Sequence, residues 1–157
     1  MPWQCSHTKR ITESLIAQYE QTAQPSLRMT ATLRNLSERI EHCLRWLPHD
    51  VELRMDAAAC DLYFGDRRGA IEHYQAALQI DRRPEIYLNL GDALYQTGDR
   101  LDAVRAYARL YAFASFIVNY DSRLPWSGDN VIDLIPTDLQ HEVQAEGQKE
   151  RERLGRS

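Results

Sequence analysis

The residue types that could support chemistry are few, and the first group of them suggests a metal site. His42, Cys43 and His49 lie close together in the sequence. On a helix, however, Cys43 belongs to an apolar stripe while the side chain of His42 points about 100° away from it. Neither an HExxH motif nor a paired-cysteine spacing accompanies them. We therefore expect no metal site at this position.

Cys60 and His73 are the other candidates for catalysis. Cys60 lies in an alanine-rich stretch, where a small thiol packs well, and no neighbouring base in the sequence would activate it as a nucleophile. His73 is expected on the outer face of its helix. The chain has no glycine-rich phosphate-binding loop. The sequence therefore predicts a protein that is not an enzyme, with no catalytic residue, metal or cofactor.

Composition excludes several classes of binding protein. The chain has 157 residues, and its 19 basic and 23 acidic residues are spread evenly along it. Without a basic cluster, neither nucleic-acid binding nor a polybasic membrane patch is indicated. The longest apolar run, residues 110–118, is shorter than the roughly 20 residues that span a bilayer. We expect neither a nucleic-acid partner nor direct insertion into a membrane.

The cysteines indicate a reducing compartment. Cys5, Cys43 and Cys60 are odd in number and form no CxxC motif, which argues against a disulfide framework. The first residues contain no apolar run of signal-peptide length. A cytoplasmic location is the resulting expectation.

Proline and glycine separate a series of helical patterns. Apolar residues recur at helical spacing, and Asp66 and Asp99, each directly after a glycine, are suitable N-caps. Residues 131–135 are the one short strand candidate. The segment 137–140 reads as a capping box that opens a last polar helix. The earlier helices are expected over residues 8–23, 26–47, 51–64, 67–80, 85–96 and 101–120.

Two of these helical stretches repeat each other. The segment that begins at Phe64 aligns with the segment that begins at Thr97, with a constant offset of 33 residues. A fixed period of this length is typical of helix-turn-helix solenoids. The small residues would allow close helix approach, and the tyrosines would fill the space one turn further on. The matching pairs are Gly65 and Gly98, Asp66 and Asp99, Arg67 and Arg100, Ala70 and Ala103, and Tyr74 and Tyr107.

The repeated segments resemble tetratricopeptide repeats. The stretch 84–110 shows the family's packing set at Tyr87, Leu90-Gly91, Leu94-Tyr95, Gly98, Ala103, Tyr107 and Leu110. The stretch 51–83 matches in its second helix. Its first helix departs from the pattern, because Arg54 and Asp61 stand where large apolar residues are usual and Ala57-Ala58 replace Leu-Gly. The resemblance implies an all-α, tetratricopeptide-like helix-turn-helix solenoid with helical caps and a C-terminal extension.

This resemblance also organises the chain. Residues 1–50 would be N-terminal helices forming a degenerate first repeat or cap, and residues 51–120 would hold two repeats, 51–83 and 84–117. Residues 121–157 would be a loop followed by a polar helix with a flexible end. The apolar helix 101–120 needs a cover, which either residues 121–145 or another subunit would supply. Trp126 is expected to tuck onto neighbouring helices rather than face a partner.

The resemblance implies protein binding, as in an adaptor, assembly factor or small chaperone. In this family the first helix of each repeat lines a concave groove. Here that groove would be acidic and partly apolar, suited to a basic and apolar peptide or helix. Asn89 alone could belong to the family's carboxylate clamp for acidic tails, so that mode is not expected. An alternative is a structural accessory subunit of a larger complex. The residues expected to line the groove are Glu52, Met55, Asp56, Ala59, Tyr63, Glu85, Leu88, Asn89, Asp92, Tyr95 and Gln96.

Overall fold

The computed structural model describes residues 26–117 and 128–155, together with Cys5, Thr8, Ser14, Leu15 and Gln18. Side chains are described at these positions except 115–117 and 128–129. Most of the helix expected over residues 8–23, and the whole loop that carries Trp126, lie outside the described residues.

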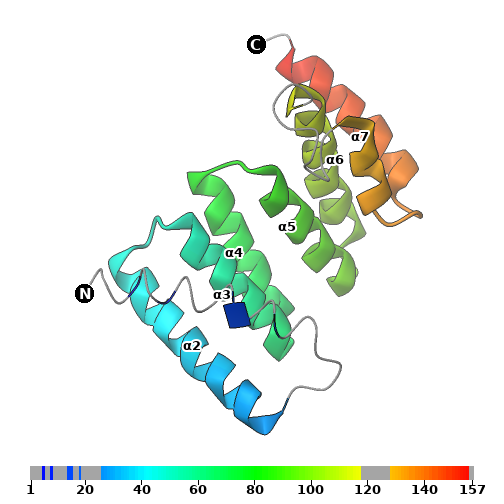
Figure 1. The fold of residues 1–157 in the computed structure, drawn as a ribbon. Helices are drawn as coiled ribbons and strands as arrows, with labels where there is room; N and C mark the ends of the chain where they lie inside the picture. The colour runs from blue at the N-terminus through cyan, green and yellow to red at the C-terminus, as the bar shows by residue number, and fades with distance from the viewer. Residues whose placement is uncertain are drawn as a thin grey trace. The chain divides into compact units, whose positions relative to one another are not determined.

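The described residues form a series of helices and contain no strand, so the all-α fold expected from the sequence is confirmed (Figure 1). The chain divides into two compact units, residues 1–81 and residues 82–157. Each unit has its own buried apolar residues and is described here by itself.

The first unit contains α2 (Leu27–Trp46), α3 (Val51–Phe64) and α4 (Arg67–Ile80). Each helix begins at a side-chain cap, because Ser26, Asp50 and Asp66 accept hydrogen bonds from backbone N–H groups three residues ahead. Gly65 ends α3 with a φ of 80°, a conformation that favours glycine. The core between α2 and α3 is formed by Leu33, Leu36, Ile40, Cys43, Leu44, Leu53, Ala57 and Cys60, with Cys5 packed among them.

The second unit contains α5 (Pro84–Thr97), α6 (Arg100–Ile117), the 3-10 helix η1 (Gly128–Leu134) and α7 (Gln140–Leu154). Gly98 ends α5 with a φ of 84°, as Gly65 ends α3. Asp99 follows it and accepts a hydrogen bond from the N–H of Asp102 at 3.4 Å. The predicted glycine–aspartate turn is therefore present at both ends of the 33-residue period.

The described C-terminal residues pack against part of α6. Both η1 and α7 pack on α6, and Val131, Ile135, Leu139 and Val143 are buried there. Gly147 allows the closest approach, because a Cβ at this position would lie 2.6 Å from the Tyr111 ring and 3.2 Å from the backbone oxygen of Ala108. Arg151 stacks over the same tyrosine ring, with its guanidinium carbon 4.1 Å from the ring centre.

The structure corrects two local predictions in this segment. Residues 131–135 form no strand; they lie in and just after the 3-10 helix η1. The expected capping box is also absent, since α7 has Leu139 at its N-cap and no side-chain cap hydrogen bond. Gln140 instead donates to the backbone oxygens of Ile132 and Ile135, at 3.1 and 3.0 Å. The helix that follows continues to Leu154.

Among the helices of the described residues, none is both long enough and apolar enough to cross a membrane.

Candidate partner-binding surface

Five of the eleven predicted binding residues lie on α3. Glu52, Met55, Asp56, Ala59 and Tyr63 are all partly exposed. Four of the positions between them, Leu53, Ala57, Ala58 and Cys60, are buried in the first unit. The helix therefore has one buried side, and its predicted binding residues lie outside it.

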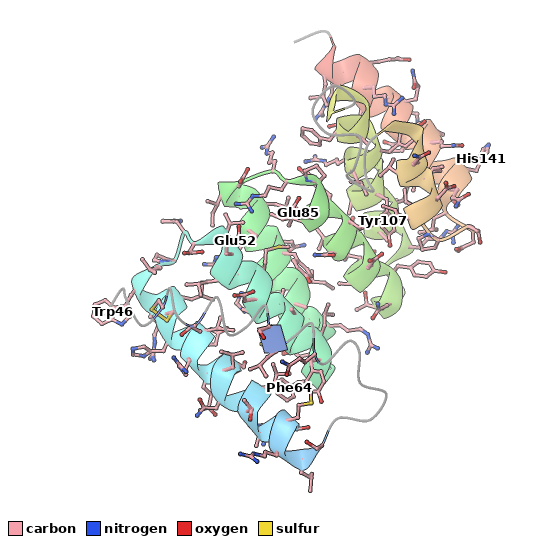
Figure 2. All side chains as sticks on the ribbon, viewed as in Figure 1. Trp46, Glu52, Phe64, Glu85, Tyr107 and His141 are labelled. Atoms are coloured by element: carbon pink, nitrogen blue, oxygen red, sulfur yellow. A yellow bond between two sulfur atoms is a disulfide. The ribbon has the colours of Figure 1, made fainter. Side chains whose placement is uncertain are left out.

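The other six lie on α5, in the second unit. Glu85, Leu88, Asn89 and Asp92 are partly exposed, and Tyr95 and Gln96 are exposed. Ile86, Tyr87, Leu90, Gly91, Ala93 and Leu94 form the buried side of this helix. Figure 2 shows Glu52 on α3 and Glu85 at the start of α5.

Several of these side chains already have partners in the protein, among them Tyr63, Glu85, Asp92 and Tyr95. Tyr63 lies 3.5 Å from the hydroxyl of Thr30 on α2, and Glu85 lies 3.8 Å from the guanidinium of Arg83. Asp92 and Tyr95 are held by Tyr107 and Asp138, as described below. The C-terminal half of the predicted α5 surface is therefore already engaged by the chain itself.

Asp92 is part of the packing between α5 and α6. The hydroxyl of Tyr107 donates to its carboxylate at 2.5 Å. Burial raises the pKa of Asp92, and this hydrogen bond opposes the increase. The Tyr107 ring lies against Gly91, where a Cβ would come within 2.5 Å of it. Asp92 is thus a positioned group with limited freedom to turn toward a partner.

Tyr95 belongs to a polar network that joins α5 to the C-terminal segment. Its hydroxyl donates to Asp138 at 3.0 Å. Arg100 donates to the Asp138 carboxylate at 2.7 Å, to its backbone oxygen at 2.8 Å and to Glu142 at 2.7 Å. The hydrogen bond from Arg100 is the main reason that the pKa of Asp138 lies below its ordinary value. The sequence does not predict this network, because residues 38 positions apart carry no local signal.

We expect Arg100→Ala to loosen the start of α7. The substitution removes the only side chain in the described part of the chain that bonds both Asp138 and Glu142. Hydrogen exchange at the backbone amides of residues 138–143 should become faster. Arg105→Ala is the matched control, because Arg105 pairs with Asp102 within α6. Equal exchange in the two variants would contradict the role given to Arg100.

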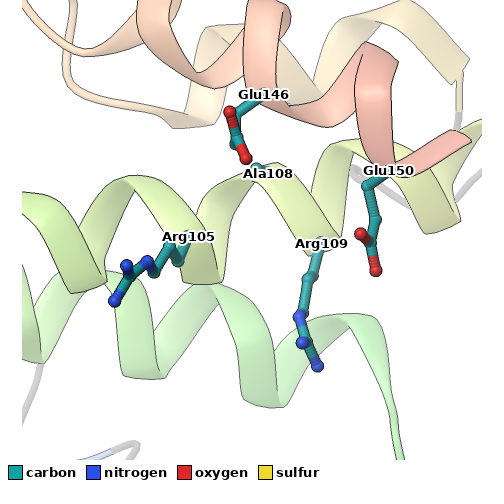
Figure 3. Close-up of a pocket in the computed structure, with 5 residues that line it drawn as sticks. All are labelled: Arg105, Ala108, Arg109, Glu146 and Glu150. Atoms are coloured by element: carbon teal, nitrogen blue, oxygen red, sulfur yellow. The ribbon is translucent and has the colours of Figure 1, made fainter. Parts of the chain in front are cut away.

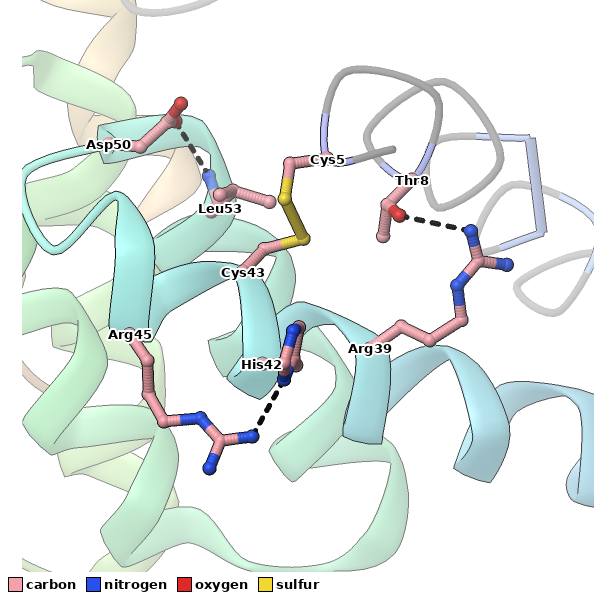
Figure 4. The surroundings of a disulfide bond; sticks show 8 residues. All are labelled: Cys5, Thr8, Arg39, His42, Cys43, Arg45, Asp50 and Leu53. Atoms are coloured by element: carbon pink, nitrogen blue, oxygen red, sulfur yellow. Dashed lines mark hydrogen bonds between the residues drawn. A yellow bond between two sulfur atoms is a disulfide. The ribbon is translucent and has the colours of Figure 1, made fainter. Parts of the chain in front are cut away.

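The prediction against a disulfide bond is wrong. Cys5 and Cys43 form a disulfide bond across 38 residues, and it is buried beside α2 (Figure 4). Thr8, also buried, accepts a hydrogen bond from Arg39 at 3.3 Å. Cys43 does lie on the apolar stripe of α2, as expected, but that position suits a disulfide as well as a thiol. The argument from reduced cysteines to a cytoplasmic location therefore no longer holds.

We base the proposal that His42, Cys60 and His73 have no catalytic role on their surroundings. His42 bonds to Arg45 at 2.8 Å. Burial raises the pKa of the Cys60 thiol to about 12, with Asp56 as the next cause, so the thiolate is disfavoured. His73 departs from the prediction, since it is half-buried between carboxylates instead of lying on the outer face of α4. Among the residues described, no cluster of three or more His, Cys, Asp or Glu could hold a metal ion.

A cavity of about 190 Å³ lies between α6 and α7 (Figure 3). Arg105, Ala108 and Arg109 line it from α6, and Glu146 and Glu150 line it from α7. Two arginines and two glutamates balance each other in charge, and three of these four pair with neighbours on their own helix. The cavity therefore favours neither an anion nor a cation.

Part of the internal repeat matches a known family of repeats. Residues 65–98 match the family model of the TPR repeat. This chain contains a tetratricopeptide repeat. The matched TPR segment runs from the glycine that ends α3 to the glycine that ends α5, which is one full period of the internal repeat. No curated protein is similar enough to match the chain. TPR repeats generally mediate protein–protein interactions, so protein partners are implied.

Proposed function

We propose that this TPR protein is a non-catalytic interaction module, an adaptor, assembly factor or small chaperone. Its partner segment would lie along the partly exposed sides of α3 and α5. The observation that carries the proposal is the chemistry of those sides. Among their eleven residues are four carboxylates, no lysine or arginine, and four large apolar or aromatic side chains, Met55, Tyr63, Leu88 and Tyr95.

A partner with basic and apolar residues fits this chemistry. Complementary charge steers the encounter and favours the correct register, while apolar anchors supply most of the affinity. An amphipathic helix or an extended peptide could present both.

The alternative role is that of an accessory subunit in a larger complex. It was suggested by the apolar helix expected over residues 101–120, which another subunit would have to cover. In the described residues, η1 and α7 pack against part of α6. That argument for a permanent partner subunit is therefore weaker, and the interaction module is the function that we favour.

The cytoplasmic location stays a proposal, and the disulfide argues against it. Disulfides persist in oxidising compartments and are rare in the cytosol. The redox state of Cys5 and Cys43 in protein taken directly from its source cells decides the question. Reduced cysteines support the cytoplasmic location, and an intact disulfide overturns it.

Peptide display against the full chain tests the proposed partner chemistry. We expect the selected peptides to combine Lys or Arg with apolar residues. Glu52→Lys with Glu85→Lys should weaken the binding of such a peptide about tenfold or more, because two attractive charges become repulsive.

The matched control for this experiment is Glu38→Lys with Glu152→Lys. Both residues are exposed, and the pair produces the same change in net charge on other helices. The control variant should retain the affinity of the unmodified chain. Selection of acidic peptides, or an equal loss of affinity in both variants, would contradict the proposal.

A further inference from the structure

Asp61 and His73 are polar at positions where the second repeat is apolar. Thirty-three residues further along, Leu94 aligns with Asp61 and Ala106 aligns with His73. Leu94 and Ala106 are both buried in the second unit. The first unit therefore has a carboxylate and an imidazole where the second unit has two buried apolar side chains. This replacement is one of the departures from the TPR pattern.

The two polar side chains meet a third one from α2. His73 on α4 has its Nε2 atom 3.1 Å from the carboxylate of Glu41 on α2 and 3.7 Å from that of Asp61 on α3. The side chains of His73 and Asp61 are only 17 % and 23 % exposed. One imidazole thus contacts carboxylates from both of the other helices in the first unit.

Further negative charge surrounds this contact. A Cβ at residue 69 would lie 2.6 Å from Asp61 Oδ2 and 2.8 Å from Asp66 Oδ2, so both carboxylates crowd the same glycine on the first turn of α4. Glu72 adds another acidic group on α4, where its own partner is Arg68 at 3.4 Å. The buried Cys60 thiol on α3 is a further titratable group here, and burial raises its pKa to about 12, so it stays protonated at neutral pH.

We propose that the contact among Asp61, His73 and Glu41 is a pH-responsive clasp that holds α2 on α3 and α4 more firmly in mildly acidic than in neutral solution. A proton taken up by the clasp removes one negative charge from a group of carboxylates that are crowded and partly desolvated. The contact between the helices then loses part of its electrostatic repulsion.

The direction of the effect follows from the titration of Asp61. Burial raises the pKa of Asp61 from 3.8 to about 6; His73 opposes this increase, and Asp66, Glu41 and Glu72 add to it. Because the raised pKa belongs to the folded state, the folded chain binds the extra proton below about pH 6. The associated stability is fully present below the ordinary pKa of an aspartate and is lost as the pH rises through 6.

Hydrogen exchange on the full chain tests this clasp. After correction for intrinsic exchange rates, the protection of the α2 amides at residues 39–44 should rise about threefold between pH 7.5 and pH 5.5, a value that allows for the partial exposure of Asp61. The variant Asp61→Leu with His73→Ala installs the residues of the second repeat and should show no such rise. An equal rise in this variant and in the unmodified chain would overturn the proposal.

Asp61→Asn provides a second variant that keeps the shape of the side chain, in case the apolar pair disturbs the fold. It too should lose the rise in protection at acidic pH. In the unmodified chain, the carboxyl carbon of Asp61 should titrate near pH 6 when followed by nuclear magnetic resonance. Titration near the ordinary aspartate value would overturn the proposal whatever the variants show.

Discussion

Tyr107→Ala is expected to lower the free energy of unfolding of residues 82–157 by about 3–5 kcal/mol. Tyr107 is fully buried and is the largest such side chain in the described residues. Its ring packs on Gly91 and its hydroxyl bonds to Asp92, so alanine leaves both a cavity and a half-buried carboxylate without its donor. Protection of the α5 and α6 amides in hydrogen exchange measures the loss.

Two further variants separate the causes of this effect. Tyr107→Phe keeps the ring and removes only the hydrogen bond to Asp92. It should therefore lower the free energy of unfolding by about 1–3 kcal/mol. Gly91→Ala keeps the tyrosine but forces a Cβ toward its buried ring, at a similar cost of about 1–3 kcal/mol. If Tyr107→Ala costs no more than Tyr107→Phe, the close packing of α5 on α6 does not carry the stability assigned to it.

Removing the disulfide is expected to destabilise the first unit by about 3–4 kcal/mol, from the loop of 38 residues that it closes. The variant Cys5→Ala with Cys43→Ala avoids placing a hydroxyl in the apolar cluster. Protection of the α2 and α3 amides should fall in this variant, while the amides of α5 and α6 should keep their protection. The second unit therefore serves as an internal reference.

A thiol count tests the same disulfide without a substitution. Denatured but unreduced protein should show one reactive thiol, which belongs to Cys60. After reduction, all three cysteines should react. Three reactive thiols before reduction would show that Cys5 and Cys43 are not joined.

The sequence predicted those parts of the fold that depend on local patterns. Glycine followed by aspartate ends one helix and caps the next at residues 65–66 and 98–99, and the structure has both turns. The apolar spacing in residues 33–44 correctly predicted the buried side of α2. These features were predictable because each depends on residues within a few positions of one another.

Other parts were unpredictable because they depend on distant partners. Cys43 has the same sequence context whether it is a thiol or part of a disulfide. Asp61 and Arg54 both break the TPR pattern, and the sequence offered no reason for either. In the structure Asp61 meets His73 and Glu41, and Arg54 donates to the backbone oxygen of Pro48 at 3.0 Å.

For the candidate surface, too, the sequence predicted the local features but not the contacts with distant residues. Helical periodicity correctly placed its residues outside the buried sides of α3 and α5. Periodicity could not show that Asp138 engages Tyr95 or that Asp92 accepts a hydrogen bond from Tyr107. Leu88 and Asn89, one turn before Asp92, are therefore better positions than Asp92 for probing a partner.

We propose that the partner contacts the partly exposed sides of both α3 and α5. Amide chemical-shift mapping of the isotope-labelled full chain, titrated with a selected basic and apolar peptide, tests this claim most directly. We predict that the shifts concentrate around Met55 and Asp56 on α3 and around Leu88 and Asn89 on α5, and that both sets follow one binding curve. Shifts confined to α4, α6 or α7, or separate curves for the two helices, would contradict it.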